Sequence, residues 1–263
     1  MKVASRSAFV DRRLTIEELA EYREQGYLRC GRVLTEAGVE QMRAESMQAW
    51  SAAKADFDPS KSWLQNTLLP NAHHHSKAVR DFYFDGPLVG FAQQIIGPNI
   101  KGATSQLTFK MRGNTKPVGW HQDNGYGHLS PYNTLTCLTA LDDADQDNGC
   151  LWLIPRSNQQ GQIEVGAAGS AEQRAAQTEL IVDADDSKAV AMPMKAGECL
   201  IFSCWTLHKS DGNMSQTRDR RILFLRYADA DAVEVYRGNA PRLGRLLRGT
   251  TRFDAVAEFE RDI

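Results

Sequence analysis

Residues 133–141 read Asn-Thr-Leu-Thr-Cys-Leu-Thr-Ala-Leu, a short run dominated by apolar and β-branched side chains. Such a run is typical of a buried β-strand. Turn sequences such as Arg112-Gly-Asn114 and Lys195-Ala-Gly197 separate it from similar runs, with no long helical pattern between them. Many short strands in this arrangement favour a sandwich or barrel over a parallel α/β sheet. The other expected strands are 105–111, 150–154, 179–182, 199–203 and 221–227.

The first hundred residues have a different pattern and are expected to be largely helix or loop. Thr15 and Glu18 form a capping-box pair that predicts a helix over residues 15–25, ending before Gly26. A second helix is expected from Thr35 to about Trp50, and a third over 86–96. Residues 164–177 are rich in Ala and Gly and predict a surface insertion, and the tail after about residue 240 has weak helical periodicity.

Composition limits the classes of protein to consider. A chain of 263 residues with 42% hydrophobic side chains can form a single domain over 1–263, which we divide into a helical part (about 1–100), a β core (about 101–230) and a tail (about 231–263). The formal charge, 31 − 33 = −2, gives no general attraction to nucleic acid or to an anionic membrane. The expected partner is a small-molecule substrate, and the oligomeric state stays open.

The sequence has no signal-peptide core and no apolar run of membrane-spanning length, so we expect a soluble, cytoplasmic protein. Its five cysteines are odd in number, contain no CxxC pair and mostly lie in apolar runs. Buried free thiols in a reducing compartment fit this pattern better than disulfides do.

One short motif indicates a metal site: Gly119-Trp-His-Gln-Asp-Asn-Gly125, followed much later by Leu207-His-Lys-Ser210. Residues two apart on a strand point to the same face, so His121 and Asp123 would lie side by side. With His208 they would form a two-histidine, one-carboxylate triad that leaves half of an octahedral metal open for ligands. A His-x-Asp pair is common by chance, and the distance to His208 permits convergence in a barrel without requiring it.

Several further stretches, in order and covering about half of the chain, resemble the phytanoyl-CoA dioxygenase family. That family belongs to the Fe(II)- and 2-oxoglutarate-dependent oxygenases and has a double-stranded β-helix, which implies a mainly β, cupin-like jelly roll with flanking helices. The matching stretches are Gln106–Lys110, Trp120–Asp123, Thr139 to Asp143, Asn148–Leu151, Pro155–Ser157, His208–Asn213 and Arg220–Tyr227.

The resemblance implies that His121, Asp123 and His208 bind the iron and that an arginine about a dozen residues after His208 binds the far carboxylate of 2-oxoglutarate. Of Arg218, Arg220 and Arg221 we favour Arg220, because the strand that follows matches the family's last strand when Arg220 starts it. A planar guanidinium suits a carboxylate. Ser210 and Gln106 match co-substrate positions, although a turn hydroxyl and a solvent-facing amide are comparable interpretations. The chain has Pro155-Arg-Ser-Asn158 where relatives have Pro-Gly-Ser-His, so no role is transferred to that loop.

The implied activity is oxidation of a C–H bond, usually hydroxylation, with 2-oxoglutarate and O2 consumed, succinate and CO2 formed, and ascorbate in support. Asp123 favours hydroxylation over halogenation, which occurs in relatives with another residue there. Asn124, Tyr126 and His128 follow the ligands and could contact a small metabolite or natural-product intermediate.

Two other functions stay open at this point. A cupin-like binding protein without turnover would share the barrel, and a metal-dependent hydrolase or isomerase could use the same triad, with Arg220 as the discriminating residue. The run His73-His74-His75 fits a polar lid or surface loop better than a second metal site, because three adjacent residues on a loop cannot all face one centre.

Overall fold

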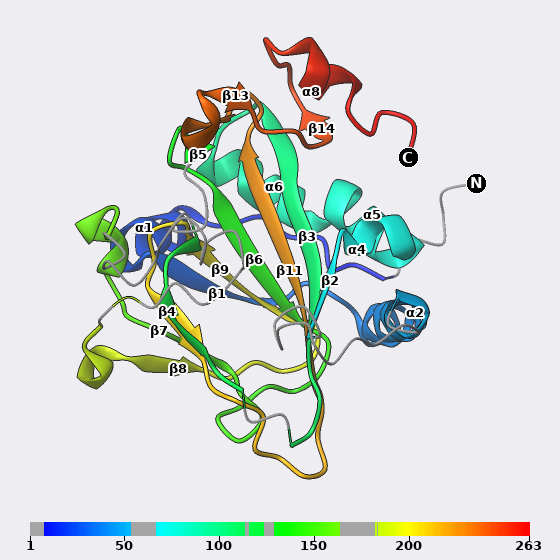
Figure 1. Cartoon of the computed structure of the whole chain (residues 1–263), viewed down its shortest axis with the longest axis vertical. Coiled ribbons are helices and arrows are strands. Elements are labelled where there is room, and N and C mark those ends of the chain that lie inside the picture. The colour runs from blue at the N-terminus through cyan, green and yellow to red at the C-terminus, as the bar shows by residue number, and fades with distance from the viewer. Residues whose placement is uncertain (1–7, 54–66, 114–115, 124–128, 164–181, 183) are drawn as a thin grey trace.

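Two antiparallel β-sheets face each other in the computed structural model, which describes residues 8–53, 67–113, 116–123, 129–163, 182 and 184–263 (Figure 1). The large sheet runs β1 (Tyr27–Arg32), β9 (Glu198–Ser203), β6 (Leu135–Ala140), β11 (Arg220–Asp229), β3 (Ile100–Lys110) and β14 (Leu246–Arg248), with β2 (Leu68–Pro70) also paired to β3. The small sheet runs β4 (Val118–His121), β10 (His208–Ser210), β7 (Leu151–Leu153) and β8 (Val190–Met192). A third, short sheet runs β13 (Ala240–Pro241), β12 (Val233–Glu234) and β5 (Leu129–Ser130). This is the predicted jelly-roll fold.

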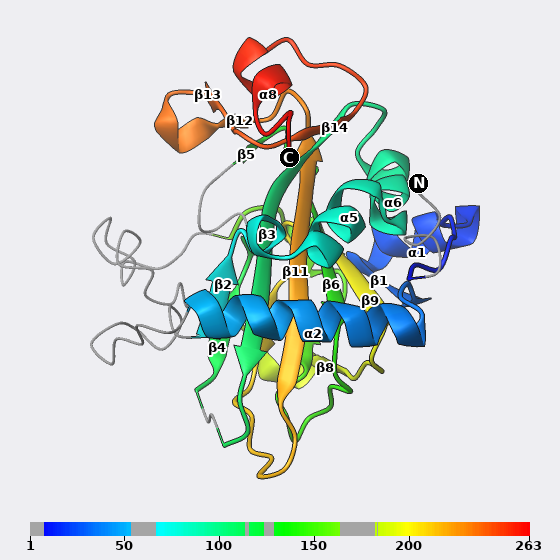
Figure 2. The same ribbon diagram turned by 90° about the vertical axis from the view of Figure 1, so that its right-hand side faces the viewer.

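Alternation along β11 gives the large sheet two different faces. Leu223, Leu225 and Tyr227 belong to the hydrophobic core beneath the helices, whereas Ile222 packs in the cluster between the two sheets. Figure 2 shows helices crossing the outer face of this sheet. They are α2 (Glu36–Ala53), α4 (Ala72–His75), α5 (Lys77–Asp85) and α6 (Pro87–Ile95).

Helix α1 (Ile16–Gln25) begins and ends where local chemistry predicts. The Thr15 side chain accepts from the Glu18 N–H and the Glu18 side chain accepts from the Thr15 N–H, which completes the capping box. Gly26 ends the helix with a φ of 81°. A Cβ at Gly26 would lie 2.5 Å from the Asn158 side-chain oxygen, so this position requires glycine for space as well as for its backbone angle.

The N-terminal hundred residues contain more strand than expected. The predicted helices are confirmed as α1, α2 and α6, but β1 joins the edge of the large sheet next to β9, and its burial alternates around Leu28 and Cys30. The six-residue strand was too short to stand out beside the neighbouring helices. Helices α4 and α5 and strand β2 were not predicted either.

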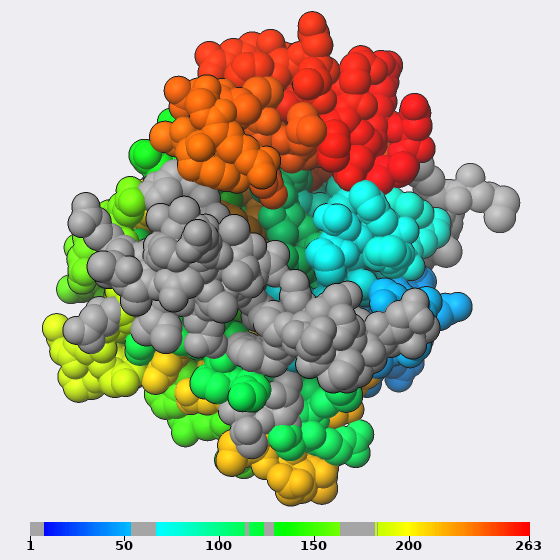
Figure 3. All heavy atoms as spheres, in the orientation of Figure 1, coloured from blue at the N-terminus to red at the C-terminus, as the bar shows by residue number. Residues whose placement is uncertain are grey.

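The tail also differs from its prediction, because only α8 (Asp254–Glu258) is an α-helix and β12, β13 and β14 precede it. These C-terminal residues cover one end of the molecule, orange to red in Figure 3. The remaining short helices are of the 3₁₀ type: η3 (Ser157–Gln160), η4 (Asp186–Lys188) and η5 (Val235–Arg237). The insertion predicted at 164–177 and most of the strand predicted at 179–182 lie outside the described residues.

The five cysteines are free and buried, as expected from their apolar neighbours. Among the described residues, no helix combines the length and the apolar character that a membrane crossing needs.

Candidate metal centre

Two adjacent strands of the small sheet bring His121 and His208 together. The strands β4 and β10 pair so that His208 lies opposite His121, and the two ring centroids are 4.1 Å apart. The Nδ1 atom of His121 lies 2.8 Å from the Gly119 carbonyl oxygen, and that of His208 lies 2.9 Å from the Thr206 carbonyl oxygen. A carbonyl can only accept, so each Nδ1 carries the proton and each Nε2 keeps its lone pair for a metal.

Asp123 completes the group, although it lies just beyond the end of β4 rather than on the strand. Ligand atoms of His121, Asp123 and His208 all lie within 4.8 Å of one another, and His208 Nε2 is 3.6 Å from Asp123 Oδ1. The Thr136 hydroxyl of β6 donates to Asp123 Oδ2 and so fixes the carboxylate. Gln122, between the two ligands, points the other way and donates to the carbonyls of Gly161 and Trp205, both at 2.8 Å. The structure therefore brings together the three residues that the sequence singled out.

Electrostatics keep His121 and Asp123 in the protonation states that a cation needs. Burial, with a further contribution from the neighbouring His208, lowers the pKa of His121 to about 3, so its imidazole is neutral at physiological pH. Burial by itself raises the pKa of Asp123, but His208, Arg226, His121 and the Thr136 hydroxyl outweigh it, and the net shift is downward. A neutral imidazole and an ionised carboxylate are the forms that ligate a metal.

The three side chains line a cavity of about 390 Å³ between the two sheets. Its apolar wall includes Leu138, Phe202, Ile222 and Phe224. Its polar wall comes from alternate residues of β3 and β11, the strands at the centre of the large sheet. These residues are Thr104, Gln106, Thr108 and Lys110 on β3, and Arg220 and Arg226 on β11.

Arg220 lies at one end of this cavity and is 3% exposed. Its Nε and Nη2 donate to the Gly149 carbonyl oxygen at 2.9 and 2.6 Å, and no carboxylate among the described residues lies within ion-pairing distance of it. Burial lowers the pKa of Arg220 to about 10, which still leaves it charged at neutral pH. A buried cation facing a cavity is a ready site for an anion.

Lys110 lies opposite Arg220 on the neighbouring strand and was missed in the sequence. Its Nζ donates to Ser210 Oγ at 2.9 Å and to the Asp211 carbonyl at 2.5 Å, so the predicted Ser210 belongs to the same end of the cavity. The signal was available: Gln106 and Lys110 are four residues apart on a strand and therefore share a face.

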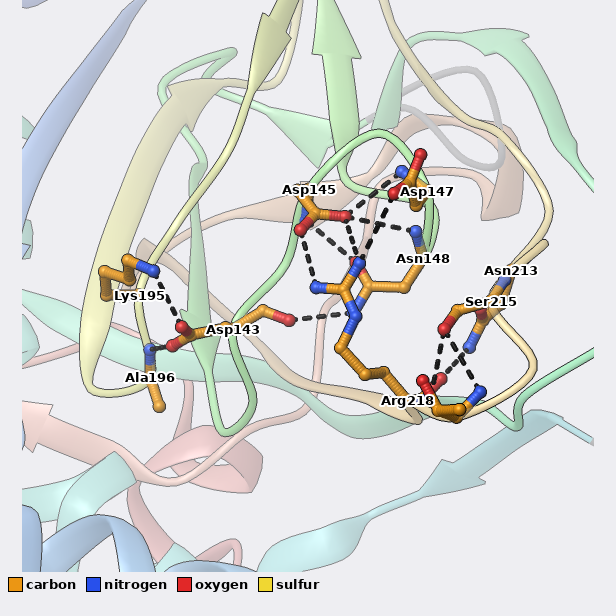
Figure 4. Close-up of polar contacts among 10 residues, drawn as sticks. Asp143, Asp145, Asp147, Asn148, Lys195, Ala196, Asn213, Ser215 and Arg218 are labelled. Carbon is orange, nitrogen blue, oxygen red and sulfur yellow. Dashed lines mark hydrogen bonds and ion pairs between the residues drawn. The ribbon is translucent and has the colours of Figure 1, made fainter.

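The other two candidate arginines point elsewhere. Arg218 donates to Asp145 through both Nη atoms, at 2.6 and 2.9 Å, within the polar network of an outer loop (Figure 4). Arg221 pairs with Asp142 at 2.6 and 2.7 Å. Of the three, only Arg220 lines the cavity.

Gln106 lines the cavity as well, and faces it rather than solvent. The candidate substrate residues Asn124, Tyr126 and His128 lie outside the described residues. Thr136 and Arg226 were not singled out in the sequence, where an isolated Thr or Arg on a strand has no distinguishing signal. The Ser157 hydroxyl of the divergent loop accepts from the Leu207 N–H at 2.9 Å and so supports the segment before His208.

A second group of metal-type donors lies outside this cavity. His73 and His74 are on helix α4, and their Nε2 atoms lie 3.2 and 2.7 Å from the two carboxylate oxygens of Glu260. His73 is buried, and its Nδ1 lies 2.6 Å from Ser105 Oγ. The prediction of a lid or surface loop is therefore wrong for His73, because the C-terminal tail covers it.

Comparison with known proteins identifies the family of this chain. The model of the family described as phytanoyl-CoA dioxygenase (PhyH) matches residues 22–222, and the chain belongs to that family. A methylphosphonate hydroxylase of Gimesia maris is 25% identical over 85% of each chain. A phytanoyl-CoA dioxygenase of Arabidopsis thaliana is 25% identical over 74% of this chain and 70% of its own. The crystal structure of SnoK, a non-heme alpha-ketoglutarate-dependent carbocyclase from nogalamycin biosynthesis, has the same fold, with a TM-score of 0.69 and 23% identity over 90% of this chain and 95% of its own.

Members of this family are Fe(II)- and 2-oxoglutarate-dependent oxygenases of small metabolites, and this chain is an enzyme of that class. The donor set fits the cofactor. Two neutral imidazoles and one carboxylate are the ligands of non-heme Fe(II) sites that keep open positions. The buried cations at one end of the same cavity suit a dicarboxylate co-substrate.

Proposed function

We propose that His121, Asp123 and His208 hold one Fe(II) and that the chain uses it to hydroxylate a C–H bond of a small polar metabolite. The observation that carries this is the direction of the lone pairs. Both Nδ1 atoms donate to backbone carbonyls, so the lone pairs lie on the Nε2 atoms, and ligand atoms of the two histidines and Asp123 lie within 4.8 Å of one another. When bound, the iron supplies the oxidising chemistry by which 2-oxoglutarate and O2 become succinate and CO2 while the substrate gains oxygen. Ascorbate would support activity by keeping the iron reduced.

The protein's own residues would position the co-substrate and exclude water. Arg220 would hold the C5 carboxylate of 2-oxoglutarate, with Lys110 and Ser210 beside it and Gln106 further along the same wall. Thr136 would keep Asp123 turned so that one carboxylate oxygen faces the histidines. Apolar side chains such as Phe202 and Ile222 would limit water around the reacting bond.

Several finer proposals accompany this function. Residues 1–263 would act as one domain in the cytoplasm on a small-molecule substrate and not on nucleic acid or membrane. Asn124, Tyr126 and His128 would contact the substrate, because they follow the ligands directly in sequence. The methylphosphonate hydroxylase among the relatives supports a small polar substrate. Asp123 supports hydroxylation rather than halogenation, because its carboxylate would be one of the residues that hold the iron.

The test is anaerobic addition of Fe(II) and 2-oxoglutarate, followed by a succinate-release screen over a metabolite library. A weak visible charge-transfer band is expected on mixing, and succinate is expected with at least one candidate. A cupin-like binding protein would give the band without succinate, and a hydrolase or isomerase would turn over without 2-oxoglutarate. Either result would rule out the oxygenase assignment.

A further inference from the structure

The Arg220 side chain is held in place by a backbone oxygen. Its Nε and Nη2 both donate to the Gly149 carbonyl, at 2.9 and 2.6 Å, and no other acceptor among the described residues bonds to this guanidinium. The Gly149 carbonyl therefore occupies the Nε edge of the planar group, and the edge formed by Nη1 and Nη2 remains for a carboxylate. The position of the Gly149 carbonyl decides where that edge points.

The peptide group that carries this carbonyl is fixed from its opposite side. The N–H of Cys150, which belongs to the same peptide group, donates to the Asp145 carbonyl at 2.8 Å. In a planar trans peptide the N–H and the C=O point in opposite directions, so a bond that fixes the N–H also fixes the carbonyl. The turn over residues 145–150 thus aims the Gly149 oxygen at Arg220.

The buried amide of Asn148 holds this turn together. Asn148 is 0% exposed, and its Oδ1 accepts from the Asp145 N–H at 2.8 Å (Figure 4). Its Nδ2 donates to the Asp143 carbonyl, also at 2.8 Å. The amide therefore bonds the backbone on both sides of Ala144. Truncating it would remove the partners of a backbone N–H and a backbone carbonyl, which is unfavourable where the groups are shielded from water.

Position 149 requires glycine for its backbone angle and for space. Gly149 has a φ of 81°, and a Cβ there would lie 2.5 Å from the Asp211 carbonyl oxygen and 3.0 Å from that of Gly212. The Asp211 carbonyl in turn accepts from Lys110, at the same end of the cavity as Arg220. Only glycine lets the turn come this close to the segment that follows Ser210.

We propose that Asn148 and Gly149 are positioning residues for the co-substrate: they set the direction of the Arg220 guanidinium and thereby the place of the C5 carboxylate of 2-oxoglutarate. This inference rests on the proposed function, in which Arg220 binds that carboxylate. Neither residue lines the cavity, so both act through Arg220 rather than by contact with the co-substrate.

Arg218 contacts the same turn in a different way and provides the matched control. It pairs with the Asp145 side chain, and the two side chains are 39% and 44% exposed. Asn148 instead bonds the Asp145 backbone, which is the part of that residue bonded to Cys150. An exposed ion pair contributes little, so Arg218→Ala should leave 2-oxoglutarate affinity within about 2-fold.

The experiment is a double-mutant cycle on the full chain with Asn148→Ala and Arg220→Ala. Each protein is loaded anaerobically with Fe(II), and 2-oxoglutarate is titrated against the charge-transfer band. We expect Asn148→Ala to weaken binding by about 10-fold when Arg220 is present and by less than about 2-fold when it is absent. Competition with a metal chelator should give an Fe(II) affinity within about 2-fold of wild type.

If Asn148→Ala does not fold, Gly149→Ala takes its place in the cycle, because the added Cβ displaces the carbonyl while the Asn148 amide stays. The proposal is overturned if the variant leaves 2-oxoglutarate affinity unchanged, or lowers it equally with and without Arg220, since a merely structural role would do the latter. Absence of the band in the wild type, or an Arg220→Ala protein that binds 2-oxoglutarate normally, would instead refute the proposed function.

Discussion

The described residues contain two clusters of two histidines and one carboxylate, and these differ in where the imidazole protons lie. In the cluster of His121, Asp123 and His208, each Nδ1 donates to a backbone carbonyl and each Nε2 keeps a lone pair. In the cluster of His73, His74 and Glu260, each Nε2 instead donates to the carboxylate. Donor types are therefore not enough to define a metal site: the lone pairs of the histidines must also point toward one centre.

The surroundings of the carboxylate also differ between the two clusters. The Thr136 hydroxyl donates to Asp123 and holds it in place. The Oδ1 atom of Asp123 lies 3.6 Å from His208 Nε2, and the residue lines a cavity. The Glu260 carboxylate accepts a hydrogen bond from each of the two imidazoles, and Arg245 donates to the backbone carbonyl of Glu260 at 3.1 Å. We interpret the second cluster as a clasp that fastens the C-terminal tail to helix α4.

The largest expected effect is on turnover. Asp123→Ala should reduce 2-oxoglutarate-dependent succinate formation by more than about 100-fold, beyond the loss expected for an outer-sphere partner of the metal. Glu260→Gln should leave the rate within about 2-fold, since Glu260 is not a ligand. A rate assay at saturating Fe(II) and 2-oxoglutarate measures both variants. Equal losses in the two would show that the clusters are not functionally distinct.

Arg220→Ala should chiefly weaken 2-oxoglutarate binding. Removing one partner of a buried charge pair costs about 2–5 kcal/mol, which is at least about 30-fold in affinity. Arg218→Ala is the control, because Arg218 binds Asp145 in an outer loop and should not affect the co-substrate. Titration of the charge-transfer band with 2-oxoglutarate gives both constants. If Arg218→Ala weakened 2-oxoglutarate binding more than Arg220→Ala did, the assignment of Arg220 as the residue that binds the C5 carboxylate would be wrong.

Thr136→Val should weaken Fe(II) binding by about 10- to 100-fold, because Asp123 loses the hydrogen bond that orients it. Thr139→Val on the same strand changes the same side chain in the same way, but position 139 faces away from the cavity. Equilibrium competition with a metal chelator measures the two affinities. If both variants bind iron as wild type does, the orienting role of Thr136 is wrong.

Acidification should destabilise the metal-free protein. Burial lowers the pKa values of His121, to about 3, and of His73, so the unfolded chain binds more protons than the folded one below the ordinary histidine pKa of about 6.5. Each group would then remove up to about 1.4 kcal/mol of unfolding free energy per pH unit between about pH 6.5 and its folded pKa. Urea unfolding at several pH values measures the slope. His121→Asn should flatten it, and an unchanged slope would contradict the burial of a neutral imidazole.

The smallest effect is expected at the clasp. Glu260→Gln removes the charge and one acceptor, so the unfolding free energy should fall by about 1 kcal/mol. The same variant should bind iron normally, and denaturant unfolding with an iron assay tests both. Loss of iron in this variant would mean that the clasp is itself a metal site.

How far the sequence predicted the site depended on local alternation. On a strand, residues two apart share a face, so His121 could be paired with Asp123. The same rule applied to Gln106 would have reached Lys110, which was missed. The preference for Arg220 over Arg218 and Arg221 came instead from the resemblance of the strand that follows to the last strand of the family. Thr136 and Arg226 became visible only when β6 and β11 were found to be neighbours, which no local pattern encodes.

The same limit explains the errors. His73 was expected in a lid or surface loop because its partner, Glu260, lies 187 residues away in a tail with weak periodicity. The many short strands predicted a sandwich or barrel, and the family resemblance implied the jelly roll. Strand β1 was hidden between two helices whose signal is stronger. Local patterns predict elements, and the contacts between distant elements decide which histidines can bind a metal.

Anaerobic titration with Fe(II) in the presence of 2-oxoglutarate, followed by the charge-transfer band, tests the contrast most directly. We predict one Fe(II) per chain for the wild type and for His74→Ala, and no band for Asp123→Ala. A full band in Asp123→Ala, or its loss in His74→Ala, would contradict the assignment of the metal centre.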